Sequence, residues 1–185
     1  MTLIYKGILL LLGILGLYWV SRPSLKTSQN HGYFRFFAWV TMLLLFLLNM
    51  NEWFTDPFCL RQIVAWFFLG ISILLVYLGA LAFRREGKIT GERQEEALLG
   101  FENTTQLITT GVYHYIRHPL YSSLLFLCWG IFLKRISWPG FLLAIVATIF
   151  LVATARIEEQ ENIRYFGDAY RTYMKASKMM IPYLF

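Results

Sequence analysis

Long apolar runs separated by short polar segments dominate the chain. A helix satisfies its own backbone hydrogen bonds, so it can cross a bilayer once it has about 20 apolar residues. No strand-like alternation of useful length interrupts these runs. The pattern therefore predicts an all-α integral membrane protein with about five transmembrane helices. The five runs are residues 3–20, 34–54, 62–83, 120–133 and 138–155.

Two of the runs leave an alternative open. The first contains Lys6 and could be a cleaved signal peptide, but Ser21-Arg22-Pro23 is a poor cleavage site, so we expect a retained anchor. The fourth run would be about 21 Å long as a helix, against about 30 Å of hydrocarbon. Either Lys134 and Arg135 extend to the interface, or this run and the next form a tight hairpin partly inside the bilayer.

The composition agrees with a membrane protein. Of the 185 residues, 57% are apolar and 15% charged, and the mean hydropathy is +0.52, which is not a soluble composition. The net charge of +6 does not require a nucleic-acid partner, because the basic residues lie in short loops beside apolar runs. Cys59 and Cys128 lack a paired or metal-type spacing, so we expect two small core residues and no metal.

The distribution of positive charge predicts an orientation. One side of the membrane would hold 13 of the 17 lysine and arginine residues, and positively charged loops favour the cytoplasm. The N-terminus is then outside and the C-terminus inside. The other side would hold Lys6, Arg61, Lys134 and Arg135.

Three regions follow from this pattern. Residues 1–83 form an N-terminal membrane region, 84–110 a charged cytoplasmic connector, and 111–185 a C-terminal region with most of the candidate chemistry. The connector is either simply solvated or a lid over a cofactor pocket. His31, in the polar loop before the second run, is expected to be solvated and receives no chemical role.

The segment 111–121 concentrates reactive side chains and reads Gly-Val-Tyr-His-Tyr-Ile-Arg-His-Pro-Leu-Tyr. Pro119 suits the first turn of a helix and pushes His118 toward an extended conformation. A helix start and the fork of Arg117 could hold a carboxylate or phosphate. Alternatively, these residues are ordinary headgroup anchors at the membrane interface.

A second polar group follows the last apolar run. Unpaired charge is costly at a membrane boundary, so a functional partner is expected for Arg156, Glu158 and Glu159. Further along, Glu161 is expected to be a surface residue, and Arg164 a surface partner of Asp168.

The end of the chain carries a helix break and an apolar segment. Phe166-Gly167 predicts the break, after which Tyr170 and Tyr173 share a helical face. Residues 179–185 are apolar enough to fold back onto the membrane or cover a pocket.

Segment 111–121 resembles the Gly-x-Tyr-x-x-x-Arg-His-Pro-x-Tyr signature of the isoprenylcysteine carboxyl methyltransferase family and the related phospholipid methyltransferases. The lead-in at 106–110 is similar too, as is a second block from Arg156-Ile-Glu158-Glu159 through Phe166-Gly167 to Tyr173 and Pro182. The resemblance covers residues 99–185, whereas the first three runs match only in hydropathy. Lys178-Met179-Met180-Ile181-Pro182 departs from the family's Arg-Val-Pro type of ending.

The resemblance implies a methyltransferase that uses S-adenosylmethionine, with a catalytic C-terminal region facing the cytoplasm. It gives a cofactor-binding role to Tyr113, His118, Tyr121 and Glu159 and makes Arg156 a candidate for orienting the methyl acceptor. Catalytic roles are assigned to His118, Arg156 and Glu159. The full set of expected cofactor-binding residues is Gln106, Tyr113, Arg117, His118, Pro119, Tyr121, Glu158 and Glu159.

Three functions remain open, and each is compatible with an apolar partner from the bilayer. The first is carboxyl methylation of a prenylated cysteine, which needs no base because a carboxylate is already a nucleophile. The second is methylation of phosphatidylethanolamine or another small lipid, where His118 or a carboxylate would remove a proton. The third is a non-enzymatic membrane subunit that binds lipid headgroups.

Overall fold

A computed structural model describes residues 3–26, 30–86 and 106–185, and this part of the chain is almost entirely helical. Its only bridge between extended segments joins Ile116 to Lys178. The helices are α1 (Leu3–Ser21), α2 (His31–Asn49), α3 (Leu60–Glu86), α4 (Pro119–Lys134), α5 (Trp138–Phe166) and α6 (Asp168–Ala176), with 3-10 turns at Ser24–Lys26, Met50–Glu52 and Gly111–His114. The predicted all-α fold is confirmed.

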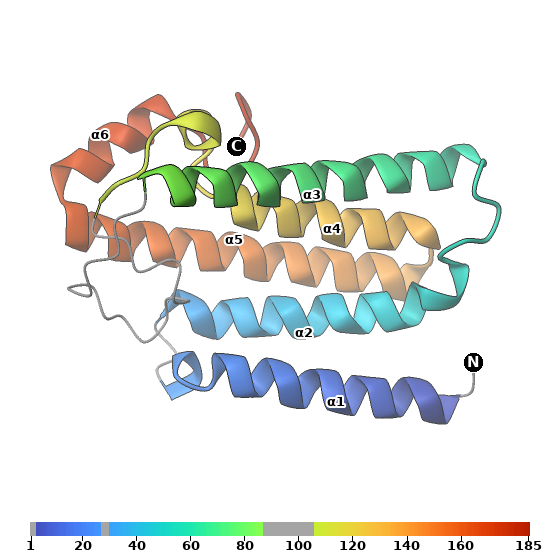
Figure 1. Cartoon of the computed structure of the whole chain (residues 1–185). Helices are drawn as coiled ribbons and strands as arrows, with labels where there is room; N and C mark the ends of the chain where they lie inside the picture. The colour runs from blue at the N-terminus through green and yellow to red at the C-terminus, as the bar shows by residue number, and fades with distance from the viewer. Residues whose placement is uncertain (1–2, 27–29, 87–105) are drawn as a thin grey trace.

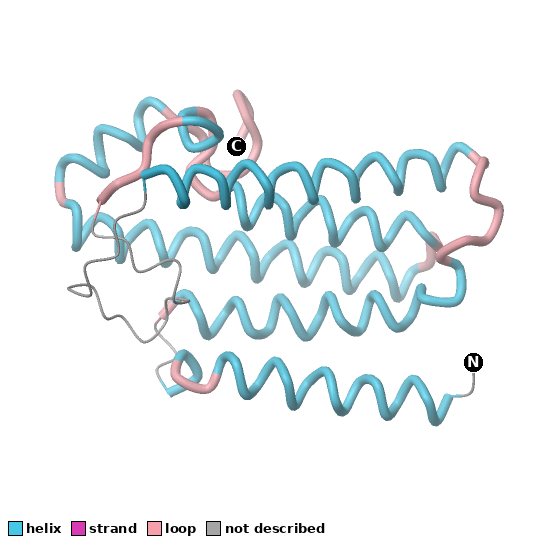
Figure 2. Tube along the Cα trace, viewed as in Figure 1, coloured by secondary structure: helices cyan, strands magenta, loops and turns pink. Residues whose placement is uncertain are grey.

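Helices α1 to α5 lie side by side, and α6 folds across one end of them (Figure 1). α3 packs mainly against α4 and α2 against α5, while α1 lies at the edge against α2. Figure 2 shows that the loops gather at the two ends of this bundle. One end carries α6, the turn Gly111–His114 and the C-terminus; the other carries the α2–α3 and α4–α5 connections.

Four helices in the described part of the chain are long and apolar enough to cross a membrane: α1, α2 with the turn that follows it, α3 and α5. The protein is therefore a multi-pass membrane protein. α4, predicted as a short fifth crossing, has only 16 residues. Apolar side chains on α1 face outward, as expected for contact with lipid.

The far end of α4 is held by buried polar contacts. Lys134 is fully buried, its Nζ donates to Gln62 Oε1 at 2.9 Å, and it lies 3.4 Å from the centre of the Trp66 ring, whereas Arg135 is exposed. Arg61 donates to the Leu133 carbonyl at 2.8 Å. Asn49 donates to the carbonyl of Ile131 at 2.8 Å. Side chains of α2 and α3 thus replace water at the end of α4, and only three residues separate α4 from α5.

α5 joins the fifth apolar run and the polar residues that follow it in one helix. The helix continues from the membrane segment through Phe166, so Arg156, Glu158 and Glu159 lie on the same rigid element as the apolar run. It ends where Gly167 adopts a φ of +61°, which confirms the predicted break. The break separates Arg164 from Asp168, and the predicted pairing between them is wrong. Asp168 instead pairs with Arg171 at 3.3 Å on the surface.

α2 corrects two further expectations. Asn30 caps this helix by accepting from Tyr33 N at 2.9 Å, so the helix starts at His31, earlier than predicted, and ends at Asn49 rather than near residue 54. His31 is not solvated but fully buried, and its imidazole contacts Glu161 of α5. Glu161 is therefore not a simple surface residue. The sequence gives no local sign of this contact because its partners are 130 positions apart.

Most of the predicted connector 84–110 lies outside the described residues, and so does the suggested lid. Its last part, residues 106–110, runs along the end of α3 toward the turn Gly111–His114.

Candidate functional site

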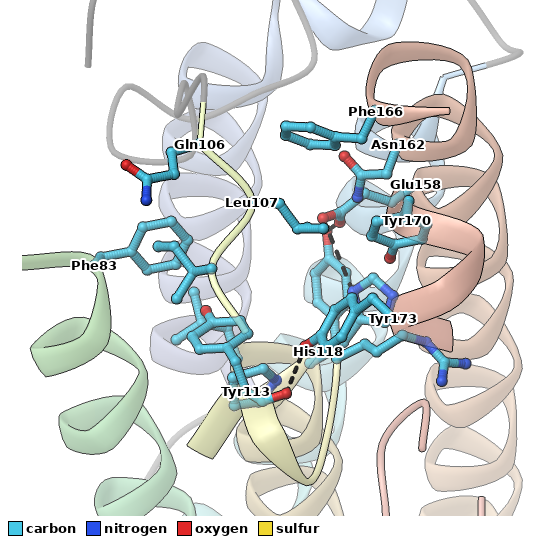
Figure 3. Close-up of a pocket in the computed structure, with 15 residues that line it drawn as sticks. Phe83, Gln106, Leu107, Tyr113, His118, Glu158, Asn162, Phe166, Tyr170 and Tyr173 are labelled. Atoms are coloured by element: carbon cyan, nitrogen blue, oxygen red, sulfur yellow. Dashed lines mark hydrogen bonds and ion pairs between the residues drawn. The ribbon is translucent and has the colours of Figure 1, made fainter. Parts of the chain in front are cut away.

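A pocket lies at the end of the bundle that carries α6, where α4 begins and α5 and α6 meet (Figure 3). It contains about 670 Å³ of unfilled space, including its open mouth. Five parts of the chain form its walls: the end of α3, the segment 106–108, the turn Gly111–His114, the last turns of α5, and α6.

The local sequence builds the entrance to α4 as predicted. Gly111 takes a φ of +60°, which suits glycine and starts the 3-10 turn. His118 is non-helical, with φ −122° and ψ 63°, and Pro119 occupies the first turn of α4. His118 is thereby held where loop becomes helix, with its ring directed at α5.

His118 lies between two carboxylates. Its Nδ1 is 3.8 Å from Glu158 Oε1, and its Nε2 is 3.5 Å from Glu159 Oε1. Nε2 is buried and makes no hydrogen bond of good geometry within the described part of the chain. The ring stacks on Tyr121 with centres 5.5 Å apart, and the Tyr121 hydroxyl donates to Glu158 Oε2 at 2.5 Å. An imidazole, two carboxylates and a phenol thus lie next to one another at the start of α4.

Arg117 is committed to its own chain. Its Nε donates to Glu159 Oε1 at 2.6 Å, and one terminal nitrogen, Nη1, donates to the carbonyls of Met174 at 3.3 Å and Ser177 at 2.5 Å. These distances bring the Arg-His-Pro turn and the paired glutamates of α5 together. Because two of its three nitrogens are occupied, Arg117 is a poorer anchor for a ligand carboxylate than the sequence suggested.

The C-terminal segment fixes the same turn from behind. Arg117 N donates to the Lys178 carbonyl at 2.8 Å, and His118 N donates to the Met179 carbonyl at 3.1 Å. Met180 is fully buried, and its carbonyl accepts from Ser122 Oγ at 2.6 Å. Of the two expected roles for residues 179–185, the first residues of the segment take neither, since they buttress the site from within the core.

Aromatic side chains form much of the remaining wall. Tyr113 meets Phe83 edge to face at 5.6 Å and accepts, through its carbonyl, a hydrogen bond of 2.6 Å from the Tyr173 hydroxyl. Tyr170 and Tyr173 are both buried on one face of α6, as predicted. Burial raises the pKa of Tyr170 and that of Tyr173 well above the usual range, so both remain neutral phenols.

Seven of the expected site residues line this pocket, whereas two do not. Glu159 accepts a hydrogen bond from Arg117 Nε, and Arg156 is exposed; both border a second hollow together with Lys178. Those in the pocket are Gln106, Tyr113, Arg117, His118, Pro119, Tyr121 and Glu158.

Sequence reasoning missed several lining residues. Asn162 stands one helical turn after Glu158 on α5, a spacing that could have identified it once α5 was known to continue. Phe83 and Phe166 carry no polar signal. Within the described residues, no group of three or more histidine, cysteine or acidic side chains could hold a metal ion.

A known protein family matches the part of the chain that builds most of this pocket. The sequence model of a family described as phospholipid methyltransferase matches residues 60–169, which include α3, α4, α5 and most of the pocket. No solved structure matches the chain.

Curated relatives share part of the chain. A methanethiol S-methyltransferase of Crocosphaera subtropica is 26% identical over 121 residues, covering 65% of this chain and 44% of the relative. Methanethiol S-methyltransferase 1 of Bradyrhizobium diazoefficiens is 34% identical over 88 residues, covering 46% and 30%. Methanethiol S-methyltransferase 2 of the same organism is 28% identical over 149 residues, covering 77% and 57%. The chain thus spans less than two thirds of each of these relatives.

Proposed function

The chain belongs to the phospholipid methyltransferase family, and from this premise we propose that it is a membrane-embedded methyltransferase that uses S-adenosylmethionine. The reaction would take place in the pocket at the start of α4. The observation that carries the proposal is the burial of His118 between Glu158 and Glu159, inside the matched range and beside aromatic walls.

The pocket residues suit the proposed cofactor. When bound, S-adenosylmethionine supplies an electrophilic methyl group on a positively charged sulfur. The faces of Tyr121 and Tyr170 can attract such a cation. Glu158 and Asn162 offer oxygen acceptors for an ammonium group and for ribose hydroxyls. Aromatic walls also keep water away from the reacting atoms.

His118 is the proposed general base. An acceptor with an S–H or N–H bond would give its proton to the imidazole, and the two flanking carboxylates would stabilise the resulting positive charge. The deprotonated acceptor would then be positioned by the pocket residues to receive the methyl group that the bound cofactor supplies.

This geometry supports an acceptor that must lose a proton better than one that is already charged. The carboxylate of a prenylated cysteine, favoured from the sequence, would have to approach Glu158, a group of the same charge, while two nitrogens of Arg117 are occupied. A thiol leads the proposed acceptors because the relatives above carry the name methanethiol S-methyltransferase. A phospholipid amine is the second candidate, supported by the family description.

The first test is cofactor binding by the purified protein in detergent, measured by calorimetry. We expect S-adenosylmethionine to bind, and His118→Ala and Glu158→Gln each to weaken binding at least tenfold. Asp168→Asn, at a surface ion pair outside the pocket, is the control and should leave the affinity unchanged. No binding by the unaltered protein would favour the non-enzymatic lipid-binding subunit instead.

The acceptor is identified by methyl transfer from labelled cofactor. A small alkyl thiol, phosphatidylethanolamine and a prenylcysteine analogue are offered separately, and label is expected on the thiol. Label only on the prenylcysteine carboxylate would contradict the proposed role of His118 as base.

A further inference from the structure

We propose that His31 is a positioning residue, which holds the acidic turn of α5 over the pocket although it does not line the pocket itself. This inference rests on the proposed function, because its effect is read out as cofactor affinity. It starts from a buried histidine that the site described above does not use.

His31 grips one carboxylate with two groups. Its backbone N donates to Glu161 Oε1 at 3.2 Å, and its ring Nδ1 contacts Glu161 Oε2. A carboxylate at this place also lies at the N-terminal end of α2, where the helix dipole favours negative charge. Both oxygens of Glu161 are therefore fixed by the first residue of another membrane helix.

Glu161 lies on the helical turn that carries the site. It follows Glu158 by three residues and precedes Asn162 by one, and these two neighbours line the pocket. Residues three apart on a helix are neighbours on its surface, with an axial rise of about 4.5 Å between them. A displacement of Glu161 is therefore passed directly to Glu158 and Asn162.

The acidic turn is held from opposite sides. On one side, Tyr121 of α4 donates from its hydroxyl to Glu158 at 2.5 Å, and His118, just before α4, lies 3.8 Å from Glu158. α2 holds it through His31, with buried Arg35 one helical turn further on. Without the α2 side, only contacts from the pocket side would orient the turn.

The contact between His31 and Glu161 lies beyond the apolar part of the bundle. α5 is apolar up to residue 155, and packing between apolar side chains there cannot fix its polar last turns. The His31–Glu161 pair supplies a buried contact to α2 in the polar part of α5. This contact thus fixes the position of α5 as far as the turn that lines the pocket.

The test compares two substitutions at one position. His31→Ala removes the ring donor and should weaken S-adenosylmethionine binding about tenfold in calorimetry. His31→Asn places an amide N–H close to the position of Nδ1, so it should keep the affinity within about threefold of the unaltered protein. A purely space-filling role would not distinguish the variants this way, because Asn is also much smaller than His.

A control separates positioning from general loss of stability. Asn49 is buried at the opposite end of α2 and holds α4 by a side-chain hydrogen bond, so Asn49→Ala should lower the melting temperature while leaving cofactor affinity unchanged. Equal affinity in His31→Ala and the unaltered protein would overturn the inference alone. An unaltered protein that does not bind the cofactor would overturn the proposed function, and this inference with it.

Discussion

Arg117 makes a set of contacts that a residue of equal charge is not expected to reproduce. Its guanidinium joins three parts of the chain, since it bonds Glu159 of α5, Met174 of α6 and Ser177 of the following segment. Arginine can make these contacts at once because its donors are fixed in a planar fork, whereas lysine has one compact ammonium group.

We therefore expect Arg117→Lys to destabilise the protein by about 2 kcal/mol, because it leaves buried acceptors unpaired. Thermal unfolding in detergent would measure the loss. Arg171→Lys is the matched control: its ion pair with Asp168 is exposed, and the change should cost less than about 0.5 kcal/mol. An equal loss of unfolding free energy in both variants would show that the buried contacts of Arg117 stabilise the protein no more than the exposed ion pair of Arg171 does.

At the scale of residues, the sequence predicts features that are determined by residues close together in the chain, such as the start and end of a helix. Pro119 starts α4 and Gly167 ends α5 for reasons of backbone conformation that any reader of the sequence can apply. His31 and Glu161 could not be paired in the same way, since nothing local indicates that the start of α2 meets the last turns of α5.

At the scale of helices, the end of an apolar run is not the end of the helix. The apolar run of α5 ends at residue 155, and the helix continues to Phe166 because strong helix formers follow and no breaker precedes Gly167, where the sequence predicts the break. This continuation matters for the site, because it places Glu158 and Asn162 on a rigid extension of a membrane helix.

α4 differs from α5, because it is shorter than its neighbours and ends among buried polar groups. Gln62 is central there: its oxygen accepts from Lys134 Nζ at 2.9 Å, and its Nε2 donates to the carbonyls of Glu52 and Thr55, each at 2.9 Å. The α2–α3 turn and the end of α4 are thereby tied to the first turn of α3.

Gln62→Leu should lower the free energy of unfolding by about 3 kcal/mol, because a buried charge on Lys134 loses its partner. Adding Lys134→Met to this variant should recover a large part of the loss, since the charge is then removed as well. Thermal unfolding of the two single variants and the double variant would measure this. A double variant less stable than Gln62→Leu would show that Lys134 does not depend on Gln62.

The whole molecule has two chemically different ends. The proposed active site, α6 and the C-terminal segment share one end, while the buried Lys134 network and the α2–α3 turn share the other. The sequence predicts that the end with the site faces the cytoplasm, from the distribution of lysine and arginine. Which helices pair, α3 with α4 and α2 with α5, could not be predicted, because hydropathy does not specify partners.

The two native cysteines can test this orientation without any added label site. Cys59 is partly exposed in the α2–α3 turn, at the end opposite the pocket, whereas Cys128 is buried inside α4. If the site faces the cytoplasm, a maleimide that cannot cross membranes should label Cys59 in intact cells, and Cys59→Ser should abolish the signal. Labelling that requires the membrane to be opened would place the α2–α3 turn inside the cell. The pocket would then face outward, away from the cytoplasmic pool of S-adenosylmethionine on which the proposed reaction depends.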